Sequence, residues 1–253
     1  MKFLGVIPAR YASTRFPGKP LAEIMGKSMI QRVFEQAKLS KYLTDVVVAT
    51  DDERILNHVL EFGGKAVMTK TNHPSGTDRC FEAALKTNQN WDVIINIQGD
   101  EPFMEPNNID LLAQSFSKPE NQISTLICPL TEIEEIQSRD LVKVVFDSHQ
   151  NALYFSRFPI PFLRNQTIEN WLEENTFFQH LGIYAYRFDV LKELVKLPPS
   201  QLEKAESLEQ LRWLEASYKI KTLITEKSMP GIDTLEDLKK AENYLKTKQN
   251  YGN

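Results

Sequence analysis

The sequence predicts an α/β fold in which helices flank a mostly parallel central sheet, followed by a mixed antiparallel insertion. In about the first 120 residues, short apolar runs alternate with amphipathic segments roughly every 10–15 residues, which is the pattern of βαβ units. Beyond that point, short polar turns separate the apolar runs, as in antiparallel hairpins. Of the 253 residues, 42% are hydrophobic, which is enough for an ordinary globular core.

Buried strands and capped helices are expected to alternate through the parallel part. The run at 45–50 (DVVVAT) is apolar on both faces, as strands of a parallel sheet usually are. Ser28, Asp51-Asp52 and Ser75 precede apolar residues at helical spacing and are expected to cap helices. The predicted strands are 3–7, 45–50, 65–69 and 92–98, and the predicted helices are 29–37, 55–60, 75–85 and 106–116.

The second half contains more varied elements. Runs at 141–146 and 152–156 flank a polar turn at 147–151, which predicts an antiparallel hairpin. Further strands are predicted at 122–130, 180–186 and 219–224, with a helix around Leu208, Leu211 and Leu214 and a closing helix at 234–245 whose apolar face carries Leu235, Leu238, Ala241 and Leu245.

We expect a single domain over residues 1–253. Its core would comprise about 1–120 and 220–253, and the inserted part about 121–219. The chain contains no internal repeat and no low-complexity linker that would separate these parts.

Composition excludes several functional classes. The net charge of −4 argues against a general affinity for nucleic acid or anionic membranes. No apolar run approaches the roughly 18 residues needed to span a bilayer, and the run at 3–7 is too short for a signal peptide, so no membrane insertion is expected. Cys80 and Cys128 lack the spacing of a disulfide framework or a zinc site, which favours a reducing, cytoplasmic location.

A basic loop at 8–20 follows the first strand. It carries Arg10, Arg15 and Lys19 among small residues and three prolines. Ligands of open α/β sheets bind at the carboxyl ends of the strands, where this loop begins. Because the prolines restrict the free loop, ordering it around an anion costs less. The loop therefore predicts a polyphosphate site, with a merely solvated basic loop as the alternative.

Two common phosphate-binding motifs are excluded. No GxGxxG follows the first strand, so a dinucleotide site is unsupported. Gly26-Lys27-Ser28 resembles the end of a Walker A loop, but Leu21 stands where that motif requires glycine. We expect a turn and a helix cap there, which argues against a P-loop kinase.

Two aspartates follow predicted strands. Asp100 lies in the segment QGDEP at the end of the strand 92–98, and Asp233 precedes the closing helix. Carboxylates together with phosphate oxygens usually hold Mg²⁺. The alternatives are a turn cap for Asp100 and a helix N-cap for Asp233. Glu209 and Gln210 are expected on a solvated helix face.

Taken together, these segments resemble the CMP-Kdo synthetases, also called 3-deoxy-manno-octulosonate cytidylyltransferases. The resemblance is collinear over nearly the whole chain. The matching segments are VIPARYASTRFPGKPL (6–21), VVVATDDERI (46–55), SGTDR (75–79), NIQGDEPF (96–103), VKVVFD (142–147), ALYFSR (152–157), HLGIYAYR (180–187), LEQLR (208–212) and GIDTLEDL (231–238).

The resemblance implies a nucleotide-diphosphosugar transferase-like fold and a Mg²⁺-dependent cytoplasmic homodimer. The implied reaction joins CTP and Kdo (3-deoxy-D-manno-octulosonate) into CMP-Kdo and pyrophosphate, for lipopolysaccharide synthesis. It implies that 1–120 and 220–253 bind the nucleotide and that 121–219 serve sugar binding and dimerisation.

The same resemblance implies roles for individual residues. Arg10, Lys19, Asp100 and Asp233 would be catalytic, and the two aspartates would hold Mg²⁺. The nucleotide would contact Ala9, Arg10, Ser13, Arg15, Lys19, Ser75 and Arg79, and the sugar would contact Gln98, Arg157, His180, Tyr184, Glu209 and Gln210.

Two alternatives stay open at this point. The sugar could be another acidic one, such as 8-amino-Kdo or sialic acid, because the implied pocket is compatible with small changes in the substrate. A non-catalytic nucleotide-binding module is the second alternative. The retention of three cations and two acids argues against it.

Overall fold

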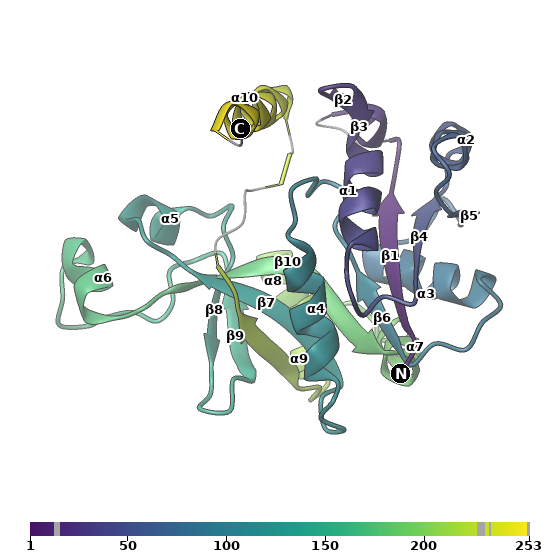
Figure 1. Ribbon diagram of the computed structural model, residues 1–253. Helices are drawn as coiled ribbons and strands as arrows, with labels where there is room; N and C mark the ends of the chain where they lie inside the picture. The colour runs from purple at the N-terminus through teal and green to yellow at the C-terminus, as the bar shows by residue number, and fades with distance from the viewer. Residues whose placement is uncertain (13–15, 227–230, 233, 252–253) are drawn as a thin grey trace. The chain divides into compact units, whose positions relative to one another are not determined.

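The computed structural model describes residues 1–12, 16–226, 231–232 and 234–251, in two compact units (Figure 1). Unit 1 contains Met1–Asp110 and Ser228–Asn253, and unit 2 contains Leu111–Lys227. The sequence predicts the division of the chain at about residues 120 and 220. The predicted strand at 219–224, which we expected at the return to the core, belongs to unit 2.

Unit 1 is built on a fully parallel sheet. Its strand order is β6-β1-β4-β5. The side chains of Leu4, Val6 and Val48 are completely buried, in agreement with the apolar pattern of the strands. The strands are β1 (Phe3–Ala9), β4 (Asp45–Thr50), β5 (Ala66–Met68) and β6 (Val93–Asn96).

Each of the first three helices of unit 1 begins at a predicted cap. Ser28 accepts a hydrogen bond from the Gln31 backbone at 3.2 Å, and Ser75 accepts one from Asp78 at 3.2 Å. Asp52 caps the helix between them. These helices are α1 (Met29–Lys38), α2 (Glu53–Glu61) and α3 (Gly76–Lys86), and α4 (Pro106–Ser115) carries the chain into unit 2.

The closing helix α10 (Leu235–Tyr251) packs through part of its predicted face. Ala241 is buried, and Leu238 and Leu245 lie against Ile24 and Met29. Leu235 is 62% exposed, so its placement on the packed face was wrong. Leu235 is the first residue of the helix, and the packed part of the apolar face begins one turn later, at Leu238.

A small hairpin in unit 1 was not predicted. It joins β2 (Glu23–Ile24) and β3 (Lys27–Ser28), after the 3₁₀ helix η1 (Lys19–Leu21). Met25 and Gly26 have φ angles of 47° and 77°, as a tight two-residue hairpin turn requires. The segment Gly26-Lys27-Ser28 thus forms a turn and a helix cap, as predicted.

Unit 2 contains a mixed sheet. Strand β7 pairs with β11 in parallel and with β10 antiparallel, and β8 pairs antiparallel with both β10 and β9. The predicted hairpin is confirmed, and Asp147 closes its turn by accepting hydrogen bonds from the backbone of His149 and Asn151. The strands are β7 (Ile123–Pro129), β8 (Lys143–Phe146), β9 (Ala152–Ser156), β10 (Phe178–Arg187) and β11 (Ile220–Ile224).

Short helices connect the strands of unit 2. Only the last of them was predicted, because Leu208, Leu211 and Leu214 recur there at helical spacing. They are α5 (Ile133–Gln137), the 3₁₀ helix η2 (Ile168–Asn170), α6 (Trp171–Glu174), α7 (Phe188–Leu194), α8 (Gln201–Glu206) and α9 (Gln210–Glu215).

The predicted fold class is confirmed by the parallel sheet of unit 1 and the mixed sheet of unit 2. Over the residues described, no helix has both the length and the apolar composition needed to cross a membrane.

Candidate active site

Lys19 and Asp100 meet in unit 1. The Nζ atom of Lys19 donates to Oδ2 of Asp100 at 2.7 Å, although the two residues are far apart in sequence. Gly99 makes this approach possible, since a Cβ atom there would lie 2.8 Å from the Pro8 carbonyl oxygen. The end of β1 and the loop after β6 are thereby held together, and the basic loop reaches the acidic segment as predicted.

Tyr11 anchors the basic loop. Its carbonyl accepts a hydrogen bond from the Gly18 backbone at 2.9 Å, and Gly18 has a φ of 73°, which glycine adopts readily. The Arg54 guanidinium lies 3.3 Å from the centre of the Tyr11 ring, and Asp52 holds it through two side-chain hydrogen bonds. Sequence reasoning missed this contact, although Asp52 and Arg54 lie in the matching segment 46–55.

The other predicted residues of the basic loop are placed only in part. Arg10 is exposed and donates from Nη2 to the His73 carbonyl at 2.8 Å. Ala9 is buried at the end of β1, where it pairs with Thr50. Ser13 and Arg15 lie outside the residues that the structure describes.

Glu82 organises the segment that receives Arg10. It accepts hydrogen bonds from the Lys70 backbone at 2.9 Å and from the His73 ring, and it forms an ion pair with Lys86 at 2.8 Å. Burial raises the pKa of Glu82, but the hydrogen bonds from Lys86, Lys70 and His73 outweigh it and lower the pKa to about 2. The ionised carboxylate therefore holds the segment at neutral pH.

Ser75 caps α3, and Arg79 lies in the first turn of that helix. The start of this helix is close to the end of β1, since a Cβ atom on Gly76 would lie 3.7 Å from Pro8 Cγ. The Ser75 hydroxyl donates to Asp78 at 2.6 Å. Arg79 is completely buried, where it donates to Thr69 and Asp51. It supports the packing of unit 1 from within, and its proximity to the base stays a prediction.

The segment after β6 carries two adjacent acids. Gln98 begins its turn by accepting a hydrogen bond from the Glu101 backbone at 3.3 Å. Burial, and then the charge of Asp100, raises the pKa of Glu101 to about 7. The Ile232 backbone donates to the Asp100 carbonyl at 2.9 Å, so the segment that leads to Asp233 runs beside Asp100. Asp233 itself is not among the described residues.

This donor set is compatible with Mg²⁺. Within the described parts of the chain, no group of three or more acidic, histidine or cysteine side chains forms a metal cage. Mg²⁺ does not require one, because it is usually bound through one or two carboxylates together with substrate phosphates and water. Asp100 is a partly exposed carboxylate beside a cation of the basic loop, which suits such a site.

Three predicted sugar-site residues of unit 2, His180, Tyr184 and Glu209, lie near one another. The rings of His180 and Tyr184 are 5.2 Å apart, and the charge of Glu209 acts on Tyr184. Burial lowers the pKa of His180 to about 3, so this ring is neutral at physiological pH. The Thr125 hydroxyl donates to the Ile183 carbonyl at 2.7 Å, and it therefore accepts from Nε2 of His180 at 3.0 Å.

Gln210 corrects the prediction of a solvated helix face. It is 5% exposed, and its amide nitrogen has no acceptor among the described residues. The reason is that α9 is short and buried on more than one side, with Leu211 and Trp213 also inside. A buried, unpaired amide donor is costly, so Gln210 is suited to a polar ligand group.

Arg157 follows β9 and is partly exposed. Its guanidinium donates from Nε to the Glu206 carbonyl at 2.9 Å and from Nη1 to the Arg139 carbonyl at 3.1 Å. A longer contact of 3.5 Å joins Nη2 to the Ser207 carbonyl. Its predicted contact with a sugar carboxylate stays a prediction.

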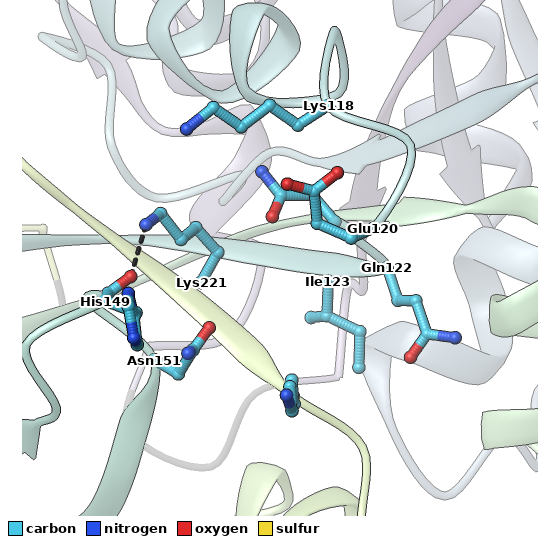
Figure 2. A pocket seen from close by; sticks show the side chains of 9 residues that line it. Lys118, Glu120, Gln122, Ile123, His149, Asn151 and Lys221 are labelled. Atoms are coloured by element: carbon cyan, nitrogen blue, oxygen red, sulfur yellow. Dashed lines mark hydrogen bonds between the residues drawn. The ribbon is translucent and has the colours of Figure 1, made fainter.

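A separate cavity of about 480 Å³ in unit 2 contains none of the predicted site residues (Figure 2). Ile123 and Lys221 line it, near the beginnings of β7 and β11. Lys221 donates to the His149 carbonyl at 2.5 Å, as Figure 2 shows. His180 instead pairs with Ile127 near the other end of β7, so this cavity is not part of the candidate sugar site.

Comparisons with known proteins agree with this arrangement. Residues 4–221 match the cytidylyltransferase family. The 3-deoxy-manno-octulosonate cytidylyltransferase of Bacteroides thetaiotaomicron is 55% identical over 98% of this chain and 100% of its own length, and that of Thermodesulfovibrio yellowstonii is 50% identical over 96% and 97%.

Solved structures give the same result. CMP:2-keto-3-deoxy-manno-octonic acid synthetase in complex with CTP superposes with a TM-score of 0.91 at 43% identity, covering 98% of this chain and 100% of that one. A 4-diphosphocytidyl-2C-methyl-D-erythritol synthase from Anaerococcus prevotii, at 17% identity and a TM-score of 0.61 over 97% and 96% of the two chains, shares the fold alone. The chain therefore belongs to the cytidylyltransferase family, among the 3-deoxy-manno-octulosonate cytidylyltransferases.

Proposed function

We propose that this protein transfers CMP from CTP to the anomeric hydroxyl of Kdo, giving CMP-Kdo and pyrophosphate for lipopolysaccharide synthesis. The observation that carries this proposal is its similarity, over nearly the whole chain, to a synthetase solved with CTP. The contact between Lys19 and Asp100 supports it, because it joins a cation of the basic loop to a carboxylate suited to Mg²⁺.

Residues of unit 1 would bind the nucleotide. Arg10 and Lys19, together with Ser13 and Arg15, would contact the CTP phosphates, and Ala9, Ser75 and Arg79 would lie near the base. The anomeric hydroxyl attacks the α-phosphorus in line, and the bond to the departing pyrophosphate breaks. Lys19 would stabilise the charge on that leaving group, since such transfers depend mainly on positioning and electrostatics.

Asp100 and Asp233 would hold Mg²⁺ in the loaded enzyme. The ion would neutralise triphosphate charge and lower the pKa of the attacking hydroxyl. Lys19 already pairs with Asp100, so in our proposal it exchanges this carboxylate for phosphate oxygens when CTP binds.

Residues of unit 2 would bind the sugar. Arg157 has the charge to pair with its carboxylate, and the neutral His180 ring is suited to a hydroxyl rather than to a second charge. The amide nitrogen of Gln210, for which the described residues supply no acceptor, would donate to another hydroxyl. Tyr184 and Glu209 of unit 2, and Gln98 of unit 1, would complete the predicted contacts.

Pyrophosphate release tests this proposal directly. The protein is mixed with CTP, Mg²⁺ and Kdo, with UTP and ATP as nucleotide controls and 8-amino-Kdo and sialic acid as sugar controls. We expect release with CTP and Kdo that stops when EDTA removes the metal. Preference for another sugar would change the substrate assignment, and CTP binding without turnover would indicate a non-catalytic module.

We further propose a cytoplasmic homodimer. Phe158 and Phe162 are 65% and 71% exposed and line an apolar cavity of about 420 Å³ in unit 2, within the part predicted to dimerise. Exposed aromatic surfaces of this kind often mark protein interfaces. Sedimentation equilibrium should give a dimer for the natural chain and a monomer for Phe162→Glu. A dimer unaffected by this change would place the interface elsewhere.

The cytoplasmic location is a separate part of the proposal, and cell fractionation tests it.

A further inference from the structure

Lys143 is a charged residue in the interior of unit 2. Its side chain is completely buried on β8. The Nζ atom donates to three backbone carbonyls, those of Ser138 at 2.6 Å, Leu141 at 2.5 Å and Arg157 at 2.7 Å. An ammonium group has three donors, so all of them are used. Burying a charge is costly, and such a group is weak evidence for stability alone.

Two of these carbonyls flank Arg139. The Arg139 carbonyl itself accepts from Nη1 of Arg157. Lys143 therefore fixes the segment 138–141, which holds the guanidinium, and also fixes the backbone carbonyl of Arg157. One buried ammonium thus connects the backbone of Arg157 to a segment that orients its side chain.

Glu206 also holds Arg157 in place. Its carboxylate accepts from the Arg157 backbone nitrogen at 2.9 Å and from the Ser156 hydroxyl at 2.7 Å, and its own carbonyl accepts from Nε of Arg157. Arginine has five N–H donors, and three of them reach carbonyls here. Within the described part of the chain, one N–H remains on each terminal nitrogen, which is the number that a bidentate carboxylate takes.

We propose that Lys143 is a positioning residue, which presents the Arg157 guanidinium to the carboxylate of the acidic sugar. This inference rests on the proposed function, and within it on the role of Arg157. Lys143 itself is buried and does not contact the substrate.

The titration of Lys143 gives the proposal a distinctive signature. The pKa of Lys143 is lowered to about 8. Burial is the largest cause, the charge of Arg157 also lowers the pKa, and the charge of Glu206 partly opposes them. Gln179, which faces Lys143 on β10, is uncharged. A neutral amine has two donors for three carbonyls, so Arg157 is expected to lose its fixed geometry as pH rises through 8.

The test is a double-mutant cycle in the pyrophosphate assay. Lys143→Met is expected to raise the KM for Kdo about tenfold or more, while the KM for CTP stays within twofold. In an Arg157→Ala background, Lys143→Met should raise the KM for Kdo no further. Lys221→Met is the matched control, because Lys221 is also a strand lysine of unit 2 that donates to a carbonyl, and it should leave both constants unchanged.

The pH profile gives a second measurement that requires no folded Lys143 variant. The KM for Kdo of the natural chain should rise between pH 7 and 9 with a midpoint near 8, and that of Arg157→Ala should not. The proposal is overturned if Lys143→Met leaves the KM for Kdo within twofold, raises both KM values equally or acts additively with Arg157→Ala. If Lys143→Met does not fold, an unchanged KM across this pH range overturns it. Absence of any pyrophosphate release by the natural chain would instead refute the proposed function.

Discussion

At the scale of single residues, the ion pair between Lys19 and Asp100 is expected to contribute more to turnover than to the stability of the fold. The pair is partly exposed, with 16% and 33% of the two side chains accessible, and ion pairs of this kind add little to stability. The same carboxylate stands where Mg²⁺ and phosphate would meet in the proposed reaction. Its loss should therefore affect turnover far more than folding.

We predict that Asp100→Asn lowers kcat at least 100-fold while the thermal unfolding temperature changes by only a few degrees. Steady-state pyrophosphate release and calorimetry measure the two quantities. Asp45→Asn is the control, because Asp45 also pairs with a lysine of unit 1, Lys65, at 2.6 Å. Full turnover in Asp100→Asn would remove Asp100 from the proposed metal site.

Glu82, in contrast to Asp100, is expected to contribute to the stability of the fold. Its pKa of about 2 lies below the unfolded value of 4.5, so its ionised form stabilises the fold above pH 4.5, and this contribution is lost as pH falls toward 2. We predict that Glu82→Gln lowers the free energy of unfolding at pH 7 by about 1–3 kcal/mol, and by less near pH 3.

Urea unfolding at the two pH values tests this prediction. Glu193→Gln serves as the control, since Glu193 pairs with Lys196 on the surface and should matter little. An equal loss at both pH values would show that shape, rather than charge, explains the role of Glu82.

At the scale of elements, the clearest signals in the sequence concerned strands and helix caps. The strand at 45–50 and the caps at Ser28, Asp52 and Ser75 were predicted because apolar runs and capping residues act locally. The short helices α5 to α8 were missed, because helices of four to seven residues depend mainly on packing. The equally short α9 was predicted only because Leu208, Leu211 and Leu214 have helical spacing.

The loop after β6 gives an element-scale prediction. Gly99→Ala places a Cβ atom about 2.8 Å from the Pro8 carbonyl, so the two loops must separate. We expect a loss of about 1–3 kcal/mol in the free energy of unfolding, together with reduced turnover. Gly76→Ala is the matched control for stability, because its Cβ atom would meet only ordinary contacts at 3.7 and 3.8 Å. Normal stability in Gly99→Ala would contradict the close packing described here.

At the scale of the whole molecule, the sequence predicted the fold class and the meeting of the basic loop with Asp100. Both follow from one rule, which places ligand-binding loops at the carboxyl ends of parallel strands. The buried positions of Gln210 and Arg79 were not predictable, because they depend on contacts between segments distant in sequence. The role of Lys143 was equally hidden, since a strand lysine ordinarily faces solvent.

The lowered pKa of His180 should make the free energy of unfolding of the protein depend on pH in the acidic range. Its folded pKa of about 3 lies below the unfolded value of 6.5, so only the unfolded chain takes up a proton between these values. We predict that the free energy of unfolding falls as pH decreases from 6.5, by an amount on the order of 4 kcal/mol by pH 3. Urea midpoints measured across this range should show a weaker slope in His180→Gln. His149→Gln, in the exposed turn after β8, is the control. An unchanged slope in His180→Gln would assign the acid sensitivity to other groups.

The stacking of Arg54 on Tyr11 has an evolutionary consequence. The two residues come from separate segments, and the guanidinium of Arg54 contacts both the Tyr11 ring and the Asp52 carboxylate. In a lineage that replaces Tyr11 by a non-aromatic residue, Arg54 would keep its ion pair with Asp52 but lose its cation–π contact. Substitutions at positions 11 and 54 should therefore occur together among related enzymes, with Asp52 following the arginine.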